Sequence, residues 1–202
     1  KIPFWAMGAL SLLPIWGFMY VRALTEAPEE VAGPLAVGAD TYGSCSSCHG
    51  GAGEGGIGRP FADGEVLLTF PHIEDQLRFV YYGTPGYQLA GVESYGDPNR
   101  EGGPHLTGSM GVMPAQGGSL TDAEILAVVC HERYTLGGAD PTSEEYAEEY
   151  ENWCGEEAPT FAALEAGSEL PTLHEDGLSG ATGPLEILPI GDAPVEGSPA
   201  EG

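Results

Sequence analysis

The run Cys45-Ser46-Ser47-Cys48-His49 holds the residues best suited to chemistry in this 202-residue chain. Two thiols at C-x-x-C spacing lie on one short helical turn, from which both reach the two vinyl groups of a single porphyrin. The histidine that follows is then placed to bind the porphyrin iron as the proximal ligand. The motif therefore predicts one covalently attached c-type haem, held by Cys45, Cys48 and His49.

Two other kinds of site use closely spaced cysteines. A thioredoxin-like redox pair shares the spacing but belongs to a βαβ context, which this sequence lacks. A zinc site needs a second Cys/His pair at close spacing, and the sequence has none. Both remain alternatives to haem, which the motif favours.

A haem iron in an electron carrier needs a second axial ligand, and the candidates are methionines. Met113 is followed by Pro114 and lies in a glycine-rich loop, which can bring backbone close to the haem face. A thioether ligand favours the reduced iron and raises its potential. We predict that His49 and Met113 are the iron ligands, with Met110 and His105 as the competitors for the second position.

Around these residues, roughly residues 36–137 resemble the class I cytochromes c. Gly38 and Tyr42 match the glycine and the aromatic residue of that family's first helix. The glycine-rich stretch after the haem motif ends at Pro60, which matches the proline whose carbonyl accepts a hydrogen bond from the proximal histidine. Met113 matches the family's Met-Pro loop. The resemblance implies a mainly α-helical fold around one haem c, with Tyr42 and Pro60 supporting the site.

The family's terminal helix, which packs across the first helix, matches Leu120 to Tyr134. Independently of the family, Thr121 and Glu124 predict a capping box at the start of this helix. An apolar stripe formed by Ile73, Leu77, Val80 and Tyr81 predicts a middle helix that ends at Gly83. One departure is that Cys130-His131 stands where the family has an aromatic residue.

Cys130 and Cys154 remain after the haem motif is set aside. The family implies haem attachment outside the bacterial cytoplasmic membrane, where disulfides are permitted. Thr142 to Cys154 is predicted to form a capped amphipathic helix. We prefer a Cys130–Cys154 disulfide that fastens this helix to the terminal helix; two buried free thiols are the alternative.

The composition divides the chain into unlike segments. Its formal net charge of −25 argues against a nucleic-acid partner. Ile2 to Val21 has no charged residue, which predicts a transmembrane anchor, with a cleaved signal peptide as the alternative. The expected segments are an N-terminal transmembrane helix at 1–24, a linker at 25–36, the haem domain at 37–137, an additional amphipathic helix at 138–157 and an extended, irregular, acidic Pro/Gly-rich tail at 158–202.

These features predict a membrane-anchored, one-electron carrier rather than an enzyme. We expect a respiratory subunit in the bacterial cytoplasmic membrane, with its haem domain on the periplasmic side. It would pass electrons between a quinol-oxidising complex and a terminal oxidase, either as a fixed subunit or as a tethered shuttle. The tail is expected to contact partner subunits, anchored by Phe161, Leu164, Leu185, Ile187, Leu188 and Ile190. The alternative is a haem enzyme or sensor acting on peroxide or a small gas after loss of Met113 as ligand.

Overall fold

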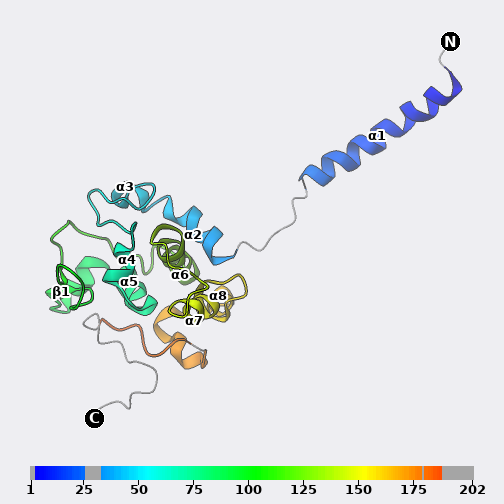
Figure 1. Ribbon diagram of the computed structural model, residues 1–202. Helices are drawn as coiled ribbons and strands as arrows, with labels where there is room; N and C mark the ends of the chain where they lie inside the picture. The colour runs from blue at the N-terminus through cyan, green and yellow to red at the C-terminus, as the bar shows by residue number, and fades with distance from the viewer. Residues whose placement is uncertain (1–2, 26–32, 179, 188–202) are drawn as a thin grey trace. The chain divides into compact units, whose positions relative to one another are not determined.

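The structure is a computed structural model that describes residues 3–25, 33–178 and 180–187. The chain divides into two compact units, residues 1–32 and residues 33–202. The described part of the first unit is the helix α1 (Phe4–Thr25), with Pro14 inside it (Figure 1). The sequence predicts a membrane anchor here. Among the residues that the structure describes, however, no helix is both long enough and apolar enough to cross a membrane.

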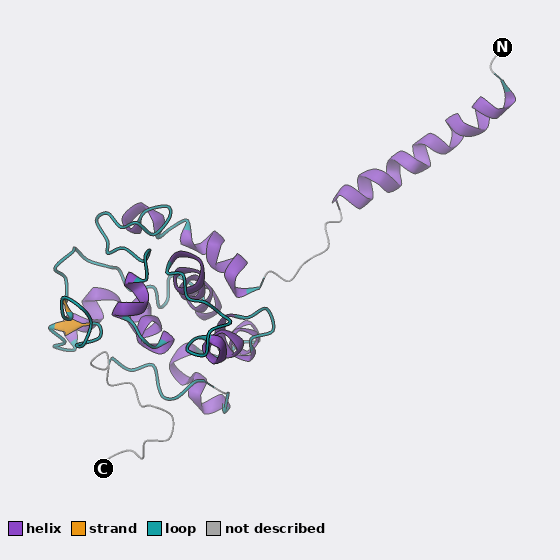
Figure 2. Cartoon of the chain, viewed as in Figure 1, coloured by secondary structure: helices purple, strands orange, loops and turns teal. Residues whose placement is uncertain are grey.

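The second unit is mainly helical, as predicted (Figure 2). The linker predicted at 25–36 ends earlier than expected, because a helix already begins at Pro34. Linker residues 26–32 lie outside the described part of the chain. A two-stranded antiparallel sheet pairs Ser94 with Leu106 and Tyr95 with His105. The elements between residues 34 and 136 are α2 (Pro34–Tyr42), α3 (Ser46–His49), α4 (Glu65–Thr69), α5 (Ile73–Leu89), β1 (Ser94–Tyr95), β2 (His105–Leu106), α6 (Asp122–Cys130) and the π-helix η1 (His131–Leu136).

Helix α2 packs against α6 at a close crossing. A Cβ atom on Gly38 would lie 2.0 Å from the carbonyl oxygen of Ala127, so only glycine permits this approach. The predicted capping box of α6 is confirmed: the backbone N–H of Glu124 donates to the Thr121 hydroxyl, and the Glu124 carboxylate accepts from the backbone N–H of Thr121.

The regular helix that begins at Ile73 ends at Gly83, as the sequence predicts, because Gly83 has φ 60° and ψ 179°. A second helical segment, which the sequence does not predict, follows directly and extends α5 to Leu89. A glycine tolerates this positive φ without strain. The break forms a kink on which the loop that carries Met113 is seated.

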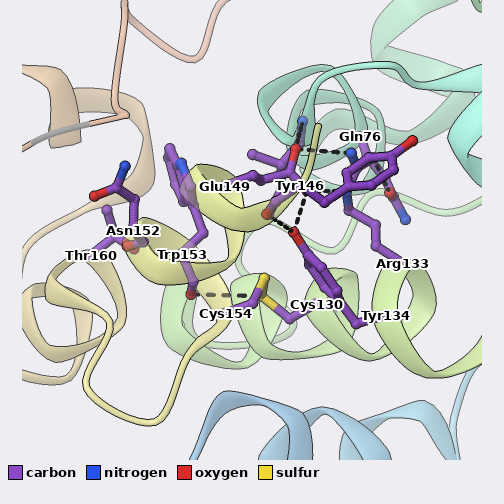
Figure 3. The surroundings of a disulfide bond; sticks show 11 residues. Gln76, Cys130, Arg133, Tyr134, Tyr146, Glu149, Asn152, Trp153, Cys154 and Thr160 are labelled. Carbon is purple, nitrogen blue, oxygen red and sulfur yellow. Dashed lines mark hydrogen bonds and ion pairs between the residues drawn. A yellow bond between two sulfur atoms is a disulfide. The ribbon is translucent and has the colours of Figure 1, made fainter. Parts of the chain in front are cut away.

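Cys130 and Cys154 form a disulfide, the pairing that the sequence favours, with 5.4 Å between their Cα atoms (Figure 3). The predicted helix from Thr142 is only partly present, as α7 (Ala147–Glu149) and the π-helix η2 (Tyr150–Cys154). The preceding residues form turns, because the Asp140 carboxylate accepts hydrogen bonds from both the N–H and the hydroxyl of Thr142. Such local bonds compete with helix formation.

The prediction of an irregular tail from residue 158 is wrong for its first half. Residues there form α8 (Pro159–Glu165) and the 3-10 helix η3 (Leu170–Asp176). Phe161, Leu164 and Leu185 are buried in the same core cluster as the disulfide, so the apolar residues expected to anchor the tail do so on this chain's own core. Leu188 and Ile190 lie outside the described residues.

Candidate functional site: a haem cavity

The haem motif forms a single helical turn, as predicted. Cys45 stands at the N-terminus of α3, and its carbonyl oxygen accepts the backbone N–H groups of Cys48 and His49, each at 3.1 Å. Both thiols are free. Cys48 and His49 line a large cavity, whereas Cys45 and Tyr42 are not among the described residues that line it.

The His49 ring is oriented by a hydrogen bond to the main chain. Its Nδ1 lies 2.8 Å from the carbonyl oxygen of Arg59. Because a carbonyl only accepts, Nδ1 carries the proton and Nε2 keeps a free lone pair, the form that ligates iron. Burial lowers the pKa of His49, which also favours the neutral ring.

This hydrogen bond corrects the role predicted for Pro60. The acceptor is the carbonyl one residue earlier, on Arg59. Pro60 restricts the residue before it to extended backbone, which directs the Arg59 carbonyl. Pro60 itself lines the cavity. Its contribution is therefore to the conformation of Arg59 and to the cavity wall.

Contacts with Phe61 and Gly58 also restrict the orientation of the His49 ring. The ring stacks on Phe61 with 4.3 Å between centroids and an interplanar angle of 13°. Near the ring lies Gly58, where an added Cβ would come within 2.7 Å of His49 Cε1. The imidazole is therefore confined between an aromatic ring and a glycine before any cofactor binds.

Met113 lies on the wall of the same cavity and is held by the kink in α5. Its N–H donates to the Thr84 hydroxyl at 3.1 Å, and its carbonyl accepts from the Thr84 N–H at 2.9 Å. A Cβ on Gly83 would lie 2.6 Å from the Met113 carbonyl oxygen, so the two segments are in close contact. The hydrogen bonds to Thr84 and the close contact with Gly83 therefore fix the backbone of Met113 at the cavity wall.

The competing ligands are less well placed. Met110 lines the cavity but is 44% exposed. His105 is not among the described residues lining the cavity and instead lies 3.3 Å from the Thr69 hydroxyl through its Nε2. These positions favour Met113 over both.

The lining of the cavity suits a haem. The cavity is partly open to solvent. Its walls are mostly apolar or aromatic, including Ile57, Phe61, Val66, Phe70, Phe79, Val80, Tyr95 and Val112. The lining also includes the Cys48 thiol, the His49 imidazole and the Met113 thioether. These groups suit a covalently attached haem with His/Met ligation.

Tyr42 supports the site without lining the cavity. Its hydroxyl donates to the Gly50 carbonyl at 2.7 Å, directly after the haem motif. Its ring packs against Phe61 and His131, with centroid distances of 6.3 and 5.4 Å. Tyr42 belongs to α2, so these contacts join that helix to the loop that follows the Cys45–His49 motif.

Sequence reasoning missed the polar residues of the cavity wall, which are Arg59, Thr69, Gln76, Thr84 and Glu132. Glu132 is 2% exposed, although acids are seldom fully buried. A sequence signal existed: Glu132 stands four positions after Val128, which belongs to the apolar stripe of the terminal helix. An acidic residue at a position where the helical pattern predicts a buried apolar side chain indicates an unusual environment for its carboxyl group.

The chain matches no protein-family model, and neither a curated protein nor a solved structure shows significant similarity to it.

Proposed function

We propose that this protein is a monohaem c-type cytochrome that carries single electrons. The observation that supports this most strongly is that Cys48, His49 and Met113, from segments far apart in the sequence, line one apolar cavity. Cys45 stands one helical turn before His49, where the second thioether is required. When bound, the haem supplies a one-electron couple whose potential the protein adjusts.

The residues of the chain perform three tasks in this function. Arg59 orients His49 so that Nε2 is available to iron. Thr84 and Gly83 hold Met113 at the cavity wall, where its thioether would bind the iron. The aromatic wall excludes water, which disfavours the more highly charged oxidised state and raises the potential. If His49 and Met113 both bind the iron, the haem would have no open position for a substrate.

We also propose an extracytoplasmic location and respiratory partners. The disulfide Cys130–Cys154 supports an oxidising compartment. Ile57 and Val112, which line the cavity, are 71% and 69% exposed, so the mouth offers an apolar contact surface. An apolar or basic redox protein suits this surface, on a route from a quinol-oxidising complex to a terminal oxidase. Of the tail expected to contact partners, residues 188–202 lie outside the described part.

Spectroscopy of the purified haem protein tests the proposed carrier role. We expect a low-spin spectrum in both oxidation states, reversible one-electron titration and no binding of carbon monoxide to the reduced protein. Met113→Ala should lose the low-spin reduced spectrum and bind carbon monoxide, whereas the matched control Met110→Ala should behave as the wild type. Rapid carbon monoxide binding by the wild type would instead favour the enzyme or sensor alternative.

A further inference from the structure

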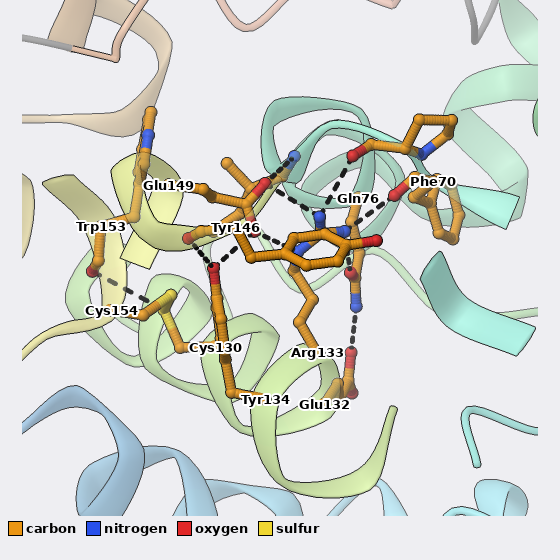
Figure 4. Close-up of polar contacts among 12 residues, drawn as sticks. Phe70, Gln76, Cys130, Glu132, Arg133, Tyr134, Tyr146, Glu149, Trp153 and Cys154 are labelled. Carbon is orange, nitrogen blue, oxygen red and sulfur yellow. Dashed lines mark hydrogen bonds and ion pairs between the residues drawn. A yellow bond between two sulfur atoms is a disulfide. The ribbon is translucent and has the colours of Figure 1, made fainter. Parts of the chain in front are cut away.

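Glu132 is the one acid among the described residues that line the haem cavity. It belongs to η1 and is almost fully buried. One of its carboxyl oxygens, Oε2, accepts a hydrogen bond from Gln76 Nε2 at 2.7 Å (Figure 4). A carboxyl in an apolar cavity with a neutral donor is a costly arrangement unless it is protonated or meets a positive charge.

The neighbouring cation does not supply that charge. Arg133 lies beyond Gln76, and its guanidinium is paired with the Glu149 carboxylate at 2.7 and 2.8 Å. Its Nη1 also lies 3.4 Å from Gln76 Oε1, which turns the Gln76 N–H toward Glu132. Burial therefore dominates and raises the pKa of Glu132 to about 8, although the Gln76 bond acts in the opposite direction.

The other titratable groups that feel the Glu132 charge are Tyr42 on α2 and Cys45 before α3. The pKa of the Tyr42 phenol is raised by burial first and by Glu132 second, so the phenol stays neutral near neutral pH. Cys45 no longer titrates once it forms a thioether. The cation on the cavity wall is Arg59, whose side chain bonds the Tyr95 hydroxyl and Ser109.

Resting on the proposed function, we propose that Glu132 is a redox-linked proton site. When the iron takes one electron from the donor protein, Fe(III) becomes Fe(II), and the Glu132 carboxylate binds one proton from solvent to become the neutral acid. Reoxidation returns the electron to the acceptor and the proton to solvent. The physical cause is charge: the oxidised site carries one more positive charge, which stabilises the nearby carboxylate, and reduction removes it.

Potentiometric titration of the full-length haem protein tests this inference. In the wild type, the midpoint potential should fall as pH rises between about pH 5 and about pH 9, by at most about 59 mV per pH unit for one proton and one electron. Glu132→Gln keeps the size of the side chain and removes the titrating group, so this slope should be lost. Glu54→Gln changes an exposed carboxylate on the motif loop and should leave the slope unchanged. An unchanged slope in Glu132→Gln would overturn the assignment.

A measurement on the wild type covers the case in which the variant does not fold. Reduction in weak buffer should take up protons, and the reduced-minus-oxidised infrared spectrum should gain the C=O band of a protonated carboxyl. A spectrum without that band would reject Glu132 as the site. The two proposals fail separately: absence of covalent haem rejects the cytochrome function, whereas attached haem with a pH-independent potential rejects only the role of Glu132.

Discussion

Thr84 and Met113 are joined by two reciprocal hydrogen bonds, of 3.1 Å from the Met113 N–H to the Thr84 hydroxyl and 2.9 Å from the Thr84 N–H to the Met113 carbonyl. Both bonds use the backbone of Met113, so they leave its thioether free to face the cavity. Thr84 directly follows Gly83, the kink in α5. The break in this helix therefore determines where Met113, the proposed second iron ligand, lies.

Substitution of Gly83 by alanine should displace the Met113 loop. The new Cβ would lie 2.5 Å from Ala115 N and 2.6 Å from Met113 O. We expect loss of thioether ligation, seen as a changed low-spin spectrum and a lower midpoint potential. Gly91→Ala is the matched control: Gly91 also has positive φ, 76°, but open space around it. Gly91→Ala should lose roughly 1–2 kcal/mol of stability from backbone strain, and Gly83→Ala should lose more because the backbone clash adds to the strain. An equal spectral change in both would contradict this role of Gly83.

Gly58→Ala should disturb the proximal side. A Cβ at this position would meet the His49 ring at 2.7–3.0 Å. We expect a lower yield of covalent haem and an altered proximal ligand field, measured by the haem-to-protein ratio and the Soret spectrum. Gly51→Ala, where no atom lies within 4 Å of the added Cβ, should load haem as the wild type does. Normal loading and spectrum in Gly58→Ala would show that His49 is not confined as described.

Removal of the disulfide should lower stability without changing the haem spectrum. Its cysteines are 24 positions apart, and a loop of that length contributes about 3 kcal/mol by chain entropy. Cys130→Ala/Cys154→Ala should therefore shift the urea midpoint downward, and Cys130→Ala alone should cost nearly as much. Unchanged stability, or loss of the low-spin spectrum, would be inconsistent with a bond that fastens α6 to η2 and whose cysteines are not among the described residues lining the cavity.

Glu149→Gln should be strongly destabilising because it leaves the buried guanidinium of Arg133 without its anion. Arg133 is fully buried, and Glu149 bonds it through both carboxylate oxygens. Breaking such a pair on one side costs about 3–5 kcal/mol. Denaturant unfolding measures the loss. The neighbouring exposed carboxylate offers a control, since Glu148→Gln should stay within about 0.5 kcal/mol of the wild type; similar losses in both would refute the assignment.

His105 should make the folded protein sensitive to acid. Thr69 donates its hydroxyl proton to the Glu65 carbonyl, so His105 Nε2 donates to Thr69. Burial first, then Arg59 and Arg100, lowers the pKa of His105 to about 4. The unfolded chain, with a histidine pKa near about 6.5, binds a proton before the folded state does. Stability is thus complete above about pH 6.5 and falls toward about pH 4.

Thermal unfolding at several pH values tests the role of His105. His105→Gln should lose less stability on acidification than the wild type, whereas His72→Gln, at an exposed position, should follow the wild type. The effect is reduced by solvent, because His105 is only partly buried. Identical pH profiles for the wild type and His105→Gln would exclude this histidine as the acid-sensitive group.

Local features were predictable from the sequence because their causes lie within a few residues. The turn that carries Cys48 and His49 and the cap at Thr121 both depend on short-range hydrogen bonds. The histidine acceptor was misplaced by one residue, since the choice between Pro60 and Arg59 depends on the orientation of a carbonyl. Sequence resemblance gives the position of such a loop but not the direction of each peptide group.

Features that depend on distant partners were not predictable in the same way. Arg133 is buried because Glu149 and the Phe70 carbonyl surround it, and neither is near it in sequence. Helix α8 lies in a Pro/Gly/Glu-rich segment and forms where Phe161 packs on a core made elsewhere in the chain. Such elements are stabilised by tertiary burial more than by their own propensity.

Haem content is the most direct measurement. The full chain, produced in cells that attach c-type haem and purified under denaturing conditions, should retain one haem per chain in a pyridine haemochrome assay and by intact mass. Cys45→Ala/Cys48→Ala should lose it, whereas Cys130→Ala/Cys154→Ala should keep it. A chain without bound haem whose Cys45 and Cys48 both react as free thiols would contradict the assignment of this cavity to a cytochrome.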